Sequence, residues 1–224
     1  MKKQQPAKPQ QTFDSHDAPL AVRMRPRSLE EFAGQKHLLG EGKMLRRALD
    51  ADRLSCLILW GPPGTGKTTL GEIVSQRTGA AFIYMNASFT VVKDIKTEIT
   101  AAHERLSQGK RTILFIDEIH RLNRTQQDVL IPDTESQYIT LMGATTYNPF
   151  FYLNPALISR SLVCEFKPLG PGDIVPLLKR ALTDKERGLG GFPVEIADEV
   201  LNDISERANG DARKALNSME IAVR

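Results

Sequence analysis

The sequence has few of the residues that build disulfide-linked or metal-held scaffolds. Two of its 224 residues are cysteines, Cys56 and Cys164, which is too few for a disulfide framework or a four-ligand zinc site. None of its apolar runs approaches the ~20 residues that a membrane-spanning helix needs. The amino-terminal segment is charged but lacks the apolar stretch of a secretory signal. These absences favour a soluble protein of a reducing compartment.

An excess of charge of one sign is also missing. Lys and Arg number 30 and Asp and Glu 27, so the net charge of +3 does not by itself indicate a nucleic-acid-binding protein. Hydrophobic residues make up 41% of the chain and charged residues 25%, which is typical of a globular protein. The length fits one large domain, or one domain with a small appendage.

Residues 1–17 differ in composition from the rest. They are rich in Gln, Lys and Pro and contain one large apolar residue, Phe13. Such a segment buries too little surface to offset its ordering entropy, so we predict a flexible basic tail. A basic arm that contacts nucleic acid is the less favoured interpretation.

Five short apolar runs predict a parallel sheet. They lie at residues 55–60, 80–85, 111–116, 138–144 and 161–166. Helical patterns separate several of these runs, near residues 67–78, 91–108 and 124–131. This alternation is typical of right-handed βαβ units with helices on both faces of the sheet. Before the first run, Ser28 and Glu31 form a capping box that predicts a short helix, and residues 43–52 predict a second.

Beyond Pro168 the pattern becomes purely helical. Three amphipathic stripes begin at Ile174, Val194 and Ala212. The preceding KPLGPG turn at 167–172 is a predicted hinge. We therefore expect an α/β domain over 18–168 and a small all-helical domain over 169–224. No stop signal follows the last stripe, so the natural protein is expected to continue beyond Arg224.

A glycine-rich loop follows the first predicted strand and precedes a predicted helix. It matches the pattern G-x-x-x-x-G-K-[ST], in which backbone N–H groups and a helix amino terminus cradle phosphates. In this pattern Lys67 reaches the β- and γ-phosphate oxygens and the Thr68 hydroxyl ligates Mg²⁺. The predicted nucleotide-binding residues are Gly61, Pro62, Pro63, Gly64, Thr65, Gly66, Lys67, Thr68 and Thr69.

Two adjacent carboxylates end the third predicted strand. Ligands of open parallel sheets bind at the carboxyl ends of the strands, where Asp117 and Glu118 are expected to lie. We predict that Asp117 holds Mg²⁺ and that Glu118 orients and deprotonates the attacking water. Because a kinase need not position water, this pair favours hydrolysis over transfer to a small acceptor.

Further candidate residues are predicted only on the assumption that a nucleotide binds at the phosphate loop. Thr145 and Thr146 end the fourth predicted strand, where a hydroxyl would lie beside the γ-phosphate. Arg160 follows a predicted short helix at 156–159, and Arg213 begins the last helical stripe. Both arginines are candidates for stabilising transition-state charge. The four histidines lack the spacing of a zinc site, and no role is predicted for them.

Several motifs, taken in order, resemble the AAA+ ATPases of the clamp-loader branch. They are GPPGTGKTT, LFIDEIHR, GATTYNPF, LISRS and NGDARKALN. The segments DEIHRLNRTQQD (117–128) and GATTYNPFFYLNPALISRS (143–161) resemble the RarA/MgsA (replication-associated recombination protein A) family, related to the Werner-helicase-interacting ATPases. The resemblance extends from about residue 19 to the end of the chain. It implies a P-loop AAA+ core followed by a helical lid, with an oligomerisation region beyond it.

The resemblance also implies roles for individual residues. Lys67 and Thr68 would belong to Walker A, and Asp117 and Glu118 to Walker B. Thr146 would be sensor 1, with Thr145 as the adjacent alternative. Arg160 would be an arginine finger acting in a neighbouring subunit, Arg213 would be sensor 2, and Asn86 would restrain Glu118 until DNA binds. Residues 25–26 and 34–39 would line the adenine pocket.

The function implied is that of a DNA-dependent, Mg²⁺-dependent ATPase in replication-fork maintenance, recombination and repair. ATP and Mg²⁺ are the implied cofactors. Single-stranded, gapped or fork-like DNA, other copies of the chain, and single-strand-binding or other replisome proteins are the implied partners. The implied location is the bacterial cytoplasm, at the nucleoid. Two alternatives remain open, namely a Holliday-junction branch-migration motor or clamp-loader subunit, and a nucleotide-gated binding module.

Overall fold

A computed structural model describes residues 18–224, so the predicted tail at 1–17 lies outside the described residues. Its centre is a five-stranded sheet with the order β2-β3-β4-β1-β5, in which every recorded strand pair is parallel. The strands are β1 (Cys56–Trp60), β2 (Ala81–Asn86), β3 (Thr112–Asp117), β4 (Thr140–Thr145) and β5 (Leu162–Glu165). All five predicted strands are confirmed, each to within two residues at either end.

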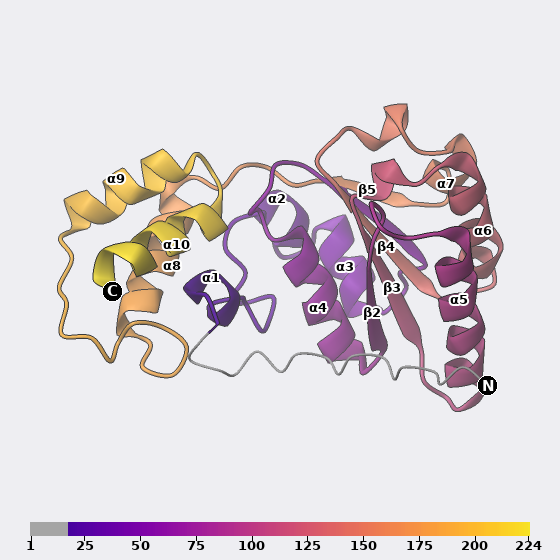
Figure 1. Cartoon of the computed structure of the whole chain (residues 1–224), viewed down its shortest axis with the longest axis horizontal. Helices are drawn as coiled ribbons and strands as arrows, with labels where there is room; N and C mark the ends of the chain where they lie inside the picture. Colours follow the sequence, from indigo (N-terminus) through magenta and orange to yellow (C-terminus); the bar gives the residue numbers. More distant parts are fainter. Residues whose placement is uncertain (1–17) are drawn as a thin grey trace.

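Helices cover both faces of this sheet (Figure 1). On one face lie α2 (Lys36–Leu39), α3 (Met44–Asp50) and α4 (Lys67–Thr78), whose leucines pack with alternate residues of β1, β3 and β4. On the other face lie α5 (Val92–Ser107), α6 (Arg124–Glu135) and α7 (Pro155–Ile158). Burial on both faces explains why the strands read as continuous apolar runs rather than as alternating patterns.

Local signals explain where several helices begin and end. The Asn123 side chain accepts a hydrogen bond from Gln126 N–H at 2.9 Å, and the Gln126 side chain accepts one from Asn123 N–H at 2.8 Å, which caps α6. Gly79 ends α4 with a φ of 66°, a left-handed conformation that glycine adopts without steric cost. Two short 3-10 turns, η1 (Ile119–Arg121) and η2 (Pro149–Phe151), follow β3 and β4.

The short helix predicted from Ser28 and Glu31 is wrong. Residues 25–35 form turns and bends rather than a helix. The Glu31 carboxylate accepts a hydrogen bond from Arg27 N–H at 3.3 Å and one from Arg187 Nη1 at 3.2 Å, while Arg180 Nη1 lies 3.5 Å away. Tertiary ion pairs therefore engage the carboxylate that a capping box would have used. The next predicted helix, at 43–52, is confirmed in shorter form as α3.

A separate group of helices packs beside the α/β core. It consists of α8 (Pro171–Thr183), α9 (Asp198–Ala208) and α10 (Ala212–Val223) together with the segments that connect them, and we call it the helical bundle. The predicted stripe from Val194 becomes helical only at Asp198. The bundle also contains α1 (Leu20–Arg23), because Leu20 and Met24 are buried in its apolar cluster. The domain boundary expected at residues 168 and 169 falls between the end of β5 and the start of α8 and stays a prediction.

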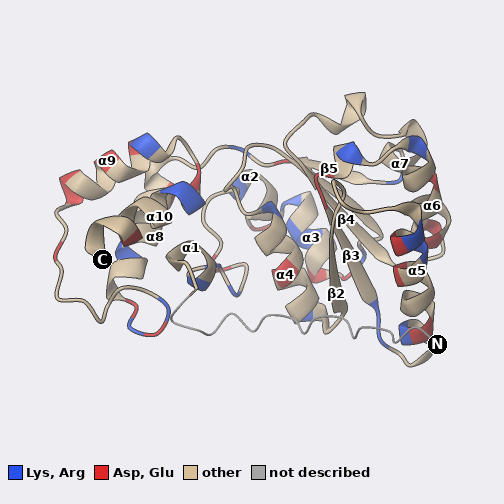
Figure 2. Ribbon diagram, in the orientation of Figure 1, with Lys and Arg blue, Asp and Glu red and all other residues tan. Residues whose placement is uncertain are grey.

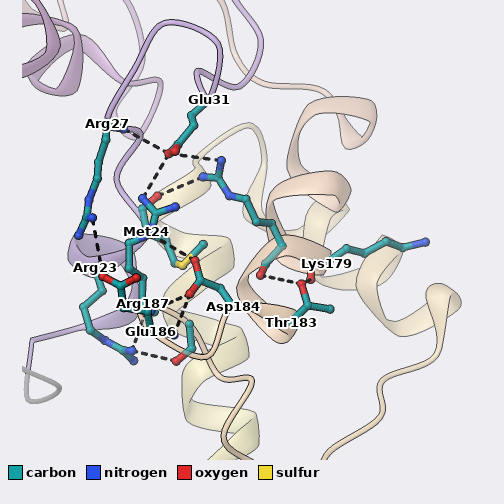
Figure 3. Close-up of polar contacts among 11 residues, drawn as sticks. Arg23, Met24, Arg27, Glu31, Lys179, Thr183, Asp184, Glu186 and Arg187 are labelled. Atoms are coloured by element: carbon teal, nitrogen blue, oxygen red, sulfur yellow. Dashed lines mark hydrogen bonds and ion pairs between the residues drawn. The ribbon is translucent and has the colours of Figure 1, made fainter. Parts of the chain in front are cut away.

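The segment that contains α1 is fastened to the bundle by buried polar contacts (Figure 3). Arg23 Nη1 donates hydrogen bonds to the carbonyl oxygens of Arg187 at 2.6 Å and Gly188 at 2.9 Å, and Arg23 Nη2 lies 3.2 Å from Glu220. Farther along the same segment, Arg25 Nη1 donates to Glu72 of α4 at 2.6 Å. The segment thus joins the bundle to the helix that follows the glycine-rich loop.

Among residues 18–224, no helix is long and apolar enough to cross a membrane. In the same part of the chain, no group of three or more His, Cys, Asp or Glu side chains is arranged to hold a metal ion. Cys56 and Cys164 lie in β1 and β5 as buried free thiols, as expected for packing residues.

Candidate active site

A cavity of about 180 Å³ lies between the carboxyl ends of the strands and the helical bundle. Its polar wall brings together residues that are far apart in the sequence. Among the predicted site residues, the cavity is lined by Pro63, Gly64, Thr65, Gly66, Lys67, Thr68, Thr69, Asp117, Glu118, Thr145, Thr146 and Arg213. The predicted phosphate loop, the acidic pair and one predicted arginine therefore share one cavity.

The glycine-rich loop adopts conformations that favour glycine and touches the bundle directly. Gly64 and Gly66 have φ values of 69° and 99°. A Cβ atom on Gly64 would lie 1.8 Å from Asp211 Oδ1, and Ala212 N–H donates a 3.2 Å hydrogen bond to Gly64 O. Because α10 begins at Ala212, this contact brings the neighbouring Arg213 to the cavity.

The Lys67 ammonium is folded back onto the loop. Its Nζ donates hydrogen bonds to the carbonyl oxygens of Gly61 at 2.7 Å and Pro62 at 2.6 Å. Burial lowers the pKa of Lys67 to about 8, although Asp117 and Glu118 act in the opposite direction. A cation this poorly solvated would gain strongly from an anion in the cavity.

Asp117 ends β3 with both carboxylate oxygens engaged. Oδ1 accepts a hydrogen bond from Glu118 N–H at 3.0 Å, and Oδ2 accepts one from the Tyr84 hydroxyl at 2.9 Å. Tyr84 lies on the adjacent strand β2, and its ring stacks on Phe115 with centroids 6.0 Å apart. Sequence reasoning missed this tyrosine because nothing in the sequence pairs β2 with β3 in register.

Glu118 follows in the left-handed region, with a φ of 54°. Its Oε2 lies 3.4 Å from His120 Nδ1, and the same nitrogen lies 2.8 Å from Thr145 Oγ1. Burial keeps the pKa of His120 below its ordinary value, with Glu118 opposing the shift. His120 was also missed, since a histidine two residues after an acidic pair has no diagnostic spacing.

The two adjacent threonines differ in their surroundings. Thr145 is 1% exposed, and its hydroxyl accepts a 3.0 Å hydrogen bond from Tyr147 N–H in addition to its contact with His120. Thr146 is exposed and also lines the cavity. The sensor role remains a prediction for Thr146, with Thr145 as the adjacent alternative.

Gly61 and Pro62, at the start of the predicted phosphate loop, are not part of the cavity lining, and neither are Arg160 and Asn86. Arg160, just beyond α7, pairs with Glu135 and donates a 2.6 Å hydrogen bond to Ala156 O. Asn86 ends β2, and its Oδ1 accepts a 2.9 Å hydrogen bond from Ser88 N–H, its recorded side-chain bond to the backbone. Their predicted roles, a finger in trans and a restraint on Glu118, remain predictions.

The apolar wall of the cavity comes from the amino-terminal segment and from the bundle. Met24, Phe32 and Leu177 line it together with Arg25 and Pro26 of the predicted adenine pocket. Residues 34–39, also predicted there, are not part of this lining. Gln35 instead exchanges hydrogen bonds with the backbone of Lys167, at 2.7 and 3.0 Å.

Comparison with known proteins agrees with this geometry. Residues 24–149 match the family model described as the Holliday junction DNA helicase RuvB P-loop domain. The chain is 48% identical to replication-associated recombination protein A of Escherichia coli K12 over 208 residues, which are 93% of this chain and 46% of that protein. It is 42% identical to ATPase WRNIP1 of Dictyostelium discoideum over 207 residues, 92% of this chain and 24% of that protein.

Solved structures are also similar to this chain in fold. The Thermotoga maritima RuvB Holliday junction branch migration motor is similar with a TM-score of 0.71 and 29% identity, covering 88% of this chain and 64% of that one. Compared with the curated relatives named replication-associated recombination protein A, the chain spans about half of their length. With an AAA+ core and a complete phosphate loop, the chain belongs to the RuvB-type P-loop domain family and is similar in sequence to replication-associated recombination protein A.

Proposed function

We propose that this chain is the catalytic part of a DNA-dependent ATPase that acts in replication-fork maintenance, recombination and repair. One observation carries the proposal. The phosphate loop, two carboxylates, two threonines and Arg213 meet in one cavity at the carboxyl edge of a parallel sheet. This combination supplies an anion cradle, metal ligands and a base, which are the parts that triphosphate hydrolysis needs.

ATP and Mg²⁺ fit the residues present. Lys67 is a half-desolvated cation bonded only to neutral carbonyl oxygens in its recorded hydrogen bonds, so phosphate oxygens would be better partners for it. The Thr68 hydroxyl and the Asp117 carboxylate are oxygen ligands of the kind that Mg²⁺ prefers. The bound ion would neutralise charge on the β- and γ-phosphates. Met24, Phe32 and Leu177 would cover the nucleobase.

Hydrolysis follows from the acidic pair. Glu118 would accept a proton from water as the water oxygen bonds to the γ-phosphorus, and the bond from that phosphorus to the β–γ bridging oxygen would break to release ADP and phosphate. Arg213 of α10 and Thr146, the residue after β4, would contact the γ-phosphate. Arg160 would complete the charge stabilisation in the site of an adjacent subunit. Asn86, at the end of β2, would restrain Glu118 in the absence of DNA.

DNA and other copies of the chain are proposed as partners from similarity. The names of these relatives refer to replication-associated recombination and to Holliday junction branch migration. Figure 2 shows both signs of charge along α5 and α9, so charge adds little to this inference. The helical bundle would act as the lid, because α10 contacts the phosphate loop through the hydrogen bond from Ala212 to Gly64.

Two substitutions test the ATPase proposal. Lys67→Ala is expected to weaken ATP binding about tenfold or more, because it removes the charge that faces the phosphates. Glu118→Gln is expected to retain ATP binding while lowering phosphate release by about a hundredfold or more, since it removes the base. Both are measured with a fluorescent ATP analogue and a phosphate-release assay, with and without single-stranded or gapped DNA.

Wild-type protein that binds no ATP, or that releases no phosphate under any of these conditions, would contradict the proposal. ATP binding without turnover would favour a nucleotide-gated binding module instead. The match to RuvB specifically favours one other motor function, Holliday-junction migration. A four-way-junction assay separates that function from remodelling of gapped or fork DNA.

A further inference from the structure

A histidine with no predicted role, His120, lies between Glu118, the proposed general base, and the end of β4. His120 is in the short turn η1, two residues after Glu118. Its Nδ1 is 3.4 Å from Glu118 Oε2 and 2.8 Å from Thr145 Oγ1. One ring nitrogen therefore faces two groups of the candidate active site, which come from the ends of β3 and β4.

The ring is fixed in orientation by its surroundings. The His120 side chain is 8% exposed, and Tyr147 and Tyr152 approach it edge-on, with centroids 4.7 and 5.9 Å away. The preceding residue, Ile119, is 0% exposed and anchors the turn in the core beneath the sheet edge. A side chain held by packing on several sides can orient the more exposed Glu118 carboxylate, whose side chain is 32% exposed.

Hydrogen-bond chemistry indicates that His120 Nδ1 is the donor and Thr145 Oγ1 the acceptor in their 2.8 Å contact. Thr145 Oγ1 already accepts a bond from Tyr147 N–H at 3.0 Å and retains a second acceptor position. With its proton on Nδ1, His120 donates to Thr145 Oγ1, and the Glu118 carboxylate lies 3.4 Å from the same nitrogen, where it is attracted by the N–H dipole. A bare Nδ1 lone pair would instead face a carboxylate, which is unfavourable.

We propose that His120 is a positioning residue that, through Nδ1–H, holds the Glu118 carboxylate against the Thr145 end of β4. This inference rests on the proposed ATPase function. Glu118 has a left-handed backbone and few recorded side-chain partners, so the histidine is what links its carboxylate to β4, whose last residue, Thr145, lines the cavity. In this arrangement His120 touches neither nucleotide nor water and acts only through Glu118.

Two isosteric substitutions separate this role from simple packing. In His120→Asn the amide nitrogen lies near the place of Nδ1, so donation to Thr145 beside the Glu118 carboxylate is retained. In His120→Gln the amide reaches the place of Nε2 and the Nδ1 contact is lost. We expect kcat for ATP hydrolysis to fall about tenfold or more in His120→Gln and about threefold or less in His120→Asn.

Binding measurements complete the experiment. The Kd for ATP is expected to change by about twofold or less in both variants, because neither removes a phosphate contact. His120→Phe, which keeps an aromatic ring among Tyr147 and Tyr152 without an Nδ1 donor, is expected to behave like His120→Gln. In a Thr145→Val background the loss caused by His120→Gln should shrink, since the two residues act through one contact. Thermal unfolding of each variant monitors folding.

Equal kcat values for the asparagine and glutamine variants, or a glutamine variant as active as wild type, would overturn the inference and leave the ATPase proposal intact. A wild-type protein without hydrolysis would overturn both. If the phenylalanine variant does not fold, the asparagine and glutamine pair still decides.

Discussion

The thiols of Cys56 and Cys164 show how position in the sheet controls reactivity at the scale of single residues. Burial in β1 and β5 raises the pKa of each thiol to about 11, and for Cys56 a 2.9 Å contact with the Ser161 hydroxyl opposes the shift. Each thiol is therefore almost wholly protonated near neutral pH, and the thiolate is the nucleophile. Both cysteines therefore serve as packing residues of the sheet rather than as redox-active thiols.

This protonation predicts slow alkylation in the native state. At pH 8 we expect iodoacetamide to modify either cysteine about a hundredfold more slowly than in urea, because a pKa two units higher leaves that much less thiolate. The rate should rise with pH toward about 11. Mass spectrometry of native and urea-unfolded protein measures it, and Cys56→Ala identifies which thiol reacts. Equal native and unfolded rates would show that the strands open readily.

At the scale of elements, the segment between α1 and α2 differs most from its sequence pattern. The Ser28 and Glu31 signal predicts a helix, yet Glu31 joins Arg180 and Arg187 of the helical bundle (Figure 3). Burial acts to raise the pKa of Glu31, but hydrogen bonds from Arg187 and Arg27 N–H outweigh it, and the pKa lies below its usual value. Long-range ion pairs thus determine the conformation of a segment with weak local preference.

We expect Glu31→Gln to lower the free energy of unfolding by about 1 kcal/mol at pH 7, a modest value because the side chain is partly exposed. A carboxylate whose pKa is depressed on folding stabilises the protein above the pKa of the unfolded chain, and this contribution is lost as pH falls through the folded pKa. The difference between wild type and variant should therefore shrink below about pH 4.5. Urea unfolding at pH 7 and pH 4 tests this.

Glu30→Gln is the matched control for this measurement. Glu30 is adjacent in sequence but is more exposed and pairs with Arg46 of α3, within the α/β core. A smaller effect is expected for it, with no loosening of the bundle. If both variants lose the same stability at pH 7, the contact between Glu31 and the bundle has no special role.

At the scale of the whole molecule, one of the two predicted catalytic arginines, Arg160, lies outside the site of its own chain. Arg213 reaches the cavity through the contact of α10 with the phosphate loop, whereas Arg160 lies outside the cavity lining, beside Glu135 of α6. Hydrolysis that needs both arginines would require a second copy of the chain to supply Arg160. The requirement can be tested by mixing subunits.

We expect Arg160→Ala and Lys67→Ala to be nearly inactive separately and to regain part of the ATPase activity when mixed. In mixed assemblies, an intact Arg160 from the Lys67→Ala subunit would face an intact nucleotide site of the Arg160→Ala subunit. Phosphate release at equal total protein measures the recovery. In the control, the Arg160→Ala subunit is mixed with a subunit that carries both Glu135→Ala and Arg160→Ala. This mixture contains no intact Arg160. A mixture no more active than its components would argue against action in trans.

Much of the architecture followed from local patterns. The five apolar runs, the Walker-type loop and the acidic pair could be located from sequence because each depends on residues that are contiguous in the chain. Burial on both faces made the strands recognisable, and glycines marked the loop whose φ values only glycine adopts easily. The carboxyl-edge rule for parallel sheets then predicted where the acidic pair would lie.

Other features depended on contacts between distant segments. Tyr84 meets Asp117 only because β2 pairs with β3 in one register, and His120 meets Thr145 only because β3 and β4 are neighbours. The membership of α1 in the helical bundle and the binding of Glu31 to two bundle arginines likewise join residues more than 140 positions apart. The sequence by itself determined the strands and the phosphate-loop motif. Tertiary packing decided which side chains contact Asp117 and Glu118 and which fasten the bundle, because no local propensity encodes contacts across the fold.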